Sequence, residues 1–141
     1  AYPLDTLYGA LAKLPAKEIT VFLDSCFSGA GGRSVLAEGM RPLVVTMENP
    51  LPASGGIVVL AAARGTEVSS AYKEAGHGLF TYYLLRGLNG EAAGQGGEVT
   101  AKSLFDYVSP RVSDDARRQN RDQTPQILPA SPDAQKAVRL R

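Results

Sequence analysis

Thr20–Gly29 reads TVFLDSCFSG, and the fold can be worked out from this segment. Its apolar first half predicts a strand over residues 19–24, and the small residues after it predict a turn. Strand ends in α/β folds carry side chains to the crevice where ligands bind. The strand therefore brings Asp24 and Cys26, the only cysteine of the chain, to a candidate site. A neighbouring base would make this thiol a reactive thiolate. A free cysteine is also commonly a small buried hydrophobe, so position alone leaves both interpretations open.

The composition indicates one globular domain and gives no electrostatic reason to expect binding to nucleic acid. The 141 residues fit a single domain, and a net charge of +1 gives no strong attraction to nucleic acid or to a membrane. No apolar run reaches the about 18 residues of a membrane helix. A single cysteine excludes an internal disulfide and is compatible with a reducing compartment. We expect a cytoplasmic protein that binds neither nucleic acid nor membrane.

Helical and extended patterns alternate along the chain. Apolar residues at helical spacing predict an amphipathic helix over 4–14 that Pro15 ends, and a continuous apolar run predicts a strand over 57–63 covered on both faces. Residues 28–56 read mostly as a long loop, in which 43–47 could form a short edge strand. The remaining expected elements are a helix over 79–88 with Gly90 as its stop signal, a helix capped by Thr100 and broken or kinked at Pro110, and an edge strand over 125–129. Such alternation implies an α/β fold with a mostly parallel sheet flanked by helices.

Three segments, in order along the chain, resemble caspase-like cysteine peptidases, and specifically their bacterial metacaspase (orthocaspase) branch. Residues 24–29 (DSCFSG) resemble the nucleophile segment of that family. Residues 61–70 (AAARGTEVSS) resemble a strand and the substrate-facing loop after it, and residues 76–85 (GHGLFTYYLL) resemble a helix start in the C-terminal half. The likeness extends over residues 4–128. It implies a three-layer caspase-like fold.

The position of histidine departs from the family pattern. The general base of the family is a histidine roughly 50 residues before the cysteine. Here no histidine precedes Cys26, and the only one, His77, follows it. We therefore interpret residues 1–141 as a single, partial peptidase domain that lacks the first strands and the histidine loop. The expected partner is the N-terminal part of the same domain, carrying the histidine, or a second copy joined through the open sheet edge. His77 acting as the base, in a Cys-before-His order, is the alternative.

The residues beside Cys26 suit cleavage after basic residues. Cys26 would attack the peptide carbonyl as a thiolate. Asp24 points to the same side of the strand, and in the metacaspase branch this aspartate pairs with Arg or Lys at P1. The alternative is that Asp24 caps backbone amides in the turn. The resemblance also assigns Ser69 to the wall of the S1 pocket, where the alternative is an ordinary turn residue.

The loop after Cys26 carries two further expectations. Calcium activates many eukaryotic metacaspases through aspartates beyond the cysteine, but here no carboxylate precedes Glu38 in this loop. We therefore expect no metal site and no cofactor. The glycine-rich loop contains Arg33 and Arg41, and we expect the enzyme to cleave itself after one of them. The alternative is an ordered loop in which both arginines are merely solvated.

These residues predict a cysteine endopeptidase that cleaves protein or peptide substrates after Arg or Lys through a Cys-His dyad. The main alternative is a catalytically inactive caspase-like scaffold that binds a protein partner through its open sheet. A redox-sensing thiol domain is a third interpretation. The lack of a second, resolving cysteine argues against it.

Overall fold

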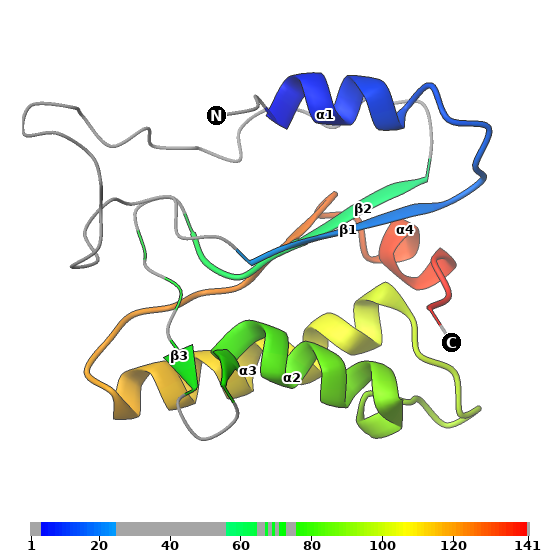
Figure 1. Ribbon diagram of the computed structural model, residues 1–141. Helices are drawn as coiled ribbons and strands as arrows, with labels where there is room; N and C mark the ends of the chain where they lie inside the picture. The colour runs from blue at the N-terminus through cyan, green and yellow to red at the C-terminus, as the bar shows by residue number, and fades with distance from the viewer. Residues whose placement is uncertain are drawn as a thin grey trace, which may run out of the picture.

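The computed structural model describes residues 4–24, 56–64, 67, 69, 71–72 and 76–140 (Figure 1). Within these ranges helices and strands alternate. The elements are α1 (Leu4–Leu11), β1 (Ile19–Leu23), β2 (Ile57–Ala61), β3 (Ala71–Tyr72), β4 (His77–Gly78), α2 (Leu79–Arg86), the π-helical turn η2 (Gly87–Glu91), α3 (Ala101–Arg118), β5 (Gln126–Leu128) and α4 (Pro132–Ala137). The possible strand over 43–47 lies outside the described residues.

β1, β2 and β5 form a mixed sheet in the order β1-β2-β5. β1 runs parallel to β2 in a register that pairs Ile19 with Ile57, whereas β5 runs antiparallel to β2. Parallel pairing is therefore confirmed for the first two strands and does not extend to the third. The reason lies just before β5, where the buried Gln123 side chain donates to the carbonyl of Ala62 at 2.9 Å. Because Ala62 follows β2, the chain enters β5 at the carboxyl end of β2 and runs back along it.

β2 forms the centre of the core and is buried along its whole length. On one face of the sheet, Ile57 and Val59 pack with Tyr8 of α1. On the other face, Val58 and Leu60 join a larger apolar cluster with α2 and α3. Figure 1 shows α1 on one side of the sheet and α2 and α3 on the other. The apolar run is thus a buried strand with helices on both sides, as predicted, and the fold is α/β.

α1 ends at Leu11, earlier than the spacing of its leucines predicts. The amides of Lys13 and Leu14 each donate to the carbonyl three residues before them, the tighter turn that is common at a helix end. The residue before a proline is disfavoured in helical conformation, so Pro15 prevents Leu14 from continuing the helix. Leu14 is 51% exposed and does not belong to the buried face of α1.

α3 continues through Pro110 as one element. Of the two expected effects, a break or a kink, the break is therefore wrong. A proline inside a helix costs about 3 kcal/mol or more, and the apolar face of α3 offsets that cost. Leu104, Val108 and Val112 are fully buried on this face, so unwinding either half of α3 would expose part of the core.

Thr100 marks a helix start as predicted, whereas α2 ends at Arg86 and the predicted stop signal Gly90 lies inside the following η2. Gly90 has a φ of 119° within η2, a conformation that side chains disfavour and glycine adopts freely. Thr100 caps α3, and the capping box includes Ser103, since each of the two side chains bonds the backbone N–H of the other residue.

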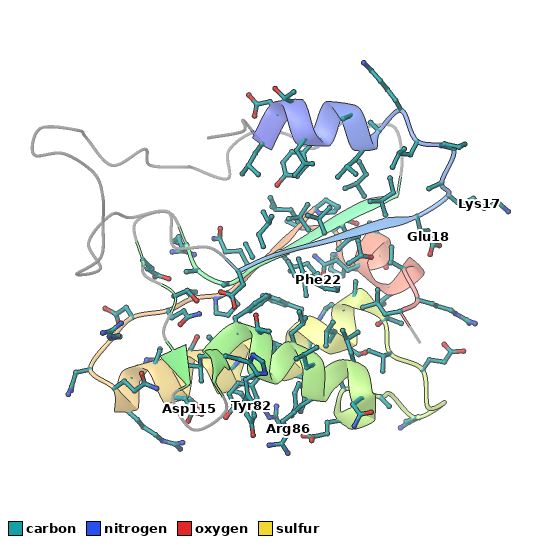
Figure 2. The ribbon with its side chains drawn as sticks, viewed as in Figure 1. Lys17, Glu18, Phe22, Tyr82, Arg86 and Asp115 are labelled. Atoms are coloured by element: carbon teal, nitrogen blue, oxygen red, sulfur yellow. The ribbon has the colours of Figure 1, made fainter. Side chains whose placement is uncertain are left out.

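A charged and aromatic cluster joins η2 to α2 and α3. The carboxylate of Glu91 accepts from Arg86 Nε at 2.6 Å and from the hydroxyl of Tyr107. The Arg86 guanidinium, followed by the Tyr107 hydroxyl, lowers the pKa of the Glu91 carboxyl. A depressed pKa in the folded state means that this carboxylate contributes stability above its unfolded pKa and that the contribution is lost as pH falls through the folded value. Figure 2 shows Arg86 and Tyr82 on the side of α2 away from the sheet.

β1 is less buried than β2. Most of its residues are half-buried, and Phe22 is 36% exposed; Figure 2 labels Phe22 on this outer strand. Among the strands that the structure describes, β1 pairs only with β2. Its outer edge therefore has no described partner.

Candidate active site

Asp24 directly follows β1 and receives three hydrogen bonds from two distant parts of the chain. Ser69 Oγ donates to Oδ1 at 2.7 Å. Thr81 donates twice to Oδ2, from Oγ1 at 2.5 Å and from its backbone N–H at 3.3 Å. Ser69 follows β2, and Thr81 lies in the first turn of α2. The structure thus brings the predicted Asp24 and Ser69 into contact at the carboxyl ends of the two parallel strands.

The same carboxylate caps α2. The N-cap residue of this helix is Gly78, which has no side chain to accept a hydrogen bond. A helix N-terminus carries unpaired N–H groups and the positive end of the helix dipole, and Asp24 satisfies the N–H of Thr81 from across the fold. Gly78 permits the approach, because a Cβ at this position would lie 2.6 Å from Oδ2 of Asp24. Asp24 therefore does cap backbone N–H groups, and the one that the structure shows belongs to α2; the turn after Asp24 lies outside the described residues.

Glu67 holds the segment that carries Ser69. Its carboxylate accepts from the backbone N–H of Thr124 at 2.6 Å, from the Thr124 hydroxyl at 3.0 Å and from the N–H of Arg64 at 3.1 Å. Thr124 lies just before β5. The segment after β2 is therefore fixed at Glu67 to the approach to β5 and at Ser69 to the end of β1.

The Asp24 carboxylate can still accept a further partner. Asp24 is exposed. A carboxylate offers about four acceptor positions, and among the residues that the structure describes Ser69 and Thr81 use three of them. Such an oriented, negatively charged group can bind a guanidinium or ammonium group through a charge-assisted hydrogen bond.

The other predicted site residues are described only in part. Cys26, Arg33 and Arg41 lie outside the described residues. His77 is exposed in β4, where it pairs across the two-stranded sheet with Tyr72 of β3.

Sequence reasoning missed Thr81, Gly78, Glu67 and Thr124 as members of this site. One local signal was available, because a glycine N-cap leaves the first turn of a helix without a side-chain acceptor. It indicates that α2 needs a partner from elsewhere in the fold. It does not identify Asp24 as that partner.

The structure adds two findings on ligands and membranes. Among the residues it describes, no group of three or more His, Cys, Asp or Glu side chains is arranged to hold a metal ion. The loop to which the calcium argument applies lies outside those residues. None of the helices within the described ranges is long and apolar enough to cross a membrane.

Comparison with known proteins gives one match. The family model of the caspase domain matches residues 3–135. Searches of curated proteins and of solved structures gave no match. The matched range includes the α/β core, the end of β1 with Asp24, and the start of α2. The chain therefore belongs to the caspase domain family, whose members are of the cysteine peptidase type.

Proposed function

We propose that the chain carries the nucleophile and the P1-binding residues of a metacaspase-like endopeptidase that cleaves after Arg or Lys. The observation that carries this proposal is the Asp24 carboxylate, which is exposed and held by Ser69 and Thr81 two residues before Cys26. A carboxylate at that place attracts a cationic P1 side chain and disfavours an acidic one.

Cys26 is the nucleophile in this proposal. Its thiolate attacks the scissile carbonyl carbon, with the backbone N–H of Cys26 as one donor to the developing oxyanion. The C–S bond forms, and the C–N bond breaks as a histidine returns the thiol proton to the leaving amine. Water then hydrolyses the thioester and releases the thiol. We assign the base to a histidine on another segment, because the general base of the family precedes the cysteine, whereas His77 follows it.

The N-terminal part of a caspase-like domain is the proposed partner of the sheet. The outer edge of β1 has no partner among the described strands, and Phe22 beside it is 36% exposed. An added strand would pair with this edge and cover apolar surface. It would complete a three-layer fold and bring the histidine to the end of β1.

The same open edge and exposed Phe22 also fit the second candidate, an inactive scaffold that binds a protein. Hydrolysis of Arg-P1 and Lys-P1 peptides, measured with the histidine-bearing segment present, tests between the two. The enzyme should turn these peptides over. Binding of a partner without any hydrolysis would favour the scaffold.

Self-processing follows from the proposed specificity. We expect cleavage after Arg33 or Arg41, with Arg33 favoured by the two glycines before it. Intact-mass analysis of the wild type and of Cys26→Ala checks this expectation. A species cut after either arginine should appear in the wild type alone. Identical mass patterns in the two proteins would exclude self-processing in this loop.

A further inference from the structure

We infer that Thr81 is a positioning residue for P1 recognition, acting through Asp24. The inference rests on the proposed function, since it concerns the carboxylate that meets the basic side chain. Thr81 is the only described residue that bonds Oδ2 of Asp24, and it does so with both its hydroxyl and its N–H. Because the N–H belongs to the first turn of α2, Oδ2 of the carboxylate is held by a helix.

The other contacts of Asp24 fix the same orientation. Ser69 bonds Oδ1 at 2.7 Å, on the opposite oxygen from Thr81. A rotation of the carboxylate would break the Ser69 bond and both Thr81 bonds together. Gly78 lies against Oδ2 so closely that a Cβ there would be 2.6 Å away. Oδ2 is therefore enclosed between Thr81 and Gly78, and the acceptor position left by the described donors lies on Oδ1.

A consequence for substrate binding follows. A P1 guanidinium or ammonium group meets Asp24 through Oδ1, beside the hydroxyl of Ser69. Thr81 never touches the substrate, but its two donors hold Oδ1 in place. Loss of the Thr81 hydroxyl should weaken binding of a basic P1 group and leave the bond-breaking steps unchanged.

The test uses Thr81→Val, which keeps the shape of the side chain, in the active enzyme with its histidine-bearing segment. KM for Arg-P1 peptides should rise on the order of three- to tenfold, less than for a lost direct bond to a charged group because Thr81 acts through Asp24, while kcat stays within about twofold. The inhibition constant of benzamidine, a small cationic probe of S1, should rise in parallel. Thr81→Ser, which restores the hydroxyl, should return both values to those of the wild type.

Thr100→Val is the matched control. Thr100 is also a threonine at a helix start, but its hydroxyl accepts from the backbone N–H of Ser103 and caps α3. Its loss should lower the melting temperature without moving KM or benzamidine inhibition. An equal rise of KM in Thr81→Val and Thr100→Val would overturn the inference, because the effect would then reflect general loss of stability.

Gly78→Ala gives an independent test that removes no hydrogen-bonding group. The added Cβ should push Oδ2 aside and raise KM, whereas Gly9→Ala, at a position with nothing within 4 Å of the new Cβ, should not. If Thr81→Val fails to fold, these two glycine variants still test whether the position of Oδ2 determines KM. If the wild type cleaves basic-P1 peptides but KM is unchanged in Thr81→Val or in Gly78→Ala, the role of Thr81 is overturned and the proposed function still stands. A wild type that cleaves no basic-P1 peptide overturns the proposed function, and the role of Thr81 with it.

Discussion

Cys26→Ala should abolish hydrolysis of Arg-P1 and Lys-P1 peptides, with a loss on the order of 10³-fold or more in kcat. Removal of the nucleophile leaves binding and oxyanion stabilisation but no acyl-enzyme route. The measurement is steady-state hydrolysis in a preparation that includes the histidine-bearing segment. Turnover at the wild-type rate in this variant would mean that another group is the nucleophile.

The control for this variant is its thermal stability. The substitution replaces the thiol group with a hydrogen atom, which is a small change in side-chain volume. The melting temperature should therefore stay close to that of the wild type. A loss of activity that accompanied unfolding would not count in favour of a catalytic Cys26, so both values are measured on the same sample.

Asp24→Asn should lower kcat/KM for Arg-P1 peptides by about 1.5–3 kcal/mol, or roughly 10- to 100-fold, as expected for a hydrogen bond that loses its charged partner. The variant should also lose stability, because an amide NH₂ cannot accept the bonds that Thr81 donates to Oδ2. The two effects are separable. Peptide hydrolysis reports the first, and thermal unfolding without substrate reports the second.

Asp106→Asn is the matched control for the charge change. Asp106 lies on the exposed side of α3 and pairs with Lys102, and exposed pairs of this kind contribute little to stability. Both variants remove one negative charge, but only Asp24→Asn removes it from the end of β1. Equal effects of the two variants on kcat/KM would refute a specific role for Asp24 in P1 binding.

Local patterns in the sequence predicted the elements that depend on neighbouring residues. The uninterrupted apolar run at 57–63 identifies β2 because a strand covered on both faces has no polar side. Thr100 identifies the start of α3 because its side chain bonds an amide only three residues away. Asp24 could be assigned to a strand end for the same reason, since the apolar run of β1 stops directly before it.

Contacts between distant segments could not be predicted in this way. The partners of Asp24 lie 45 and 57 residues away, and nothing local indicates which helix start comes to rest beside β1. The continuation of α3 through Pro110 could not be predicted locally either, because burial of the apolar face of α3 outweighs the cost of a proline inside the helix. The direction of β5 is a third example, because it depends on the hydrogen bond from Gln123 to the carbonyl of Ala62 after β2.

The most direct measurement compares kcat/KM of the wild-type enzyme for two peptides that differ only at P1, one with Arg and one with Asp. A carboxylate fixed by Ser69 and Thr81 attracts the guanidinium and repels the aspartate. The Arg peptide should be preferred by on the order of 10²-fold or more, and substitution of Lys for Arg should preserve most of that preference. A preference for Asp at P1 would contradict the assignment of Asp24 to the S1 pocket and of the enzyme to basic substrates.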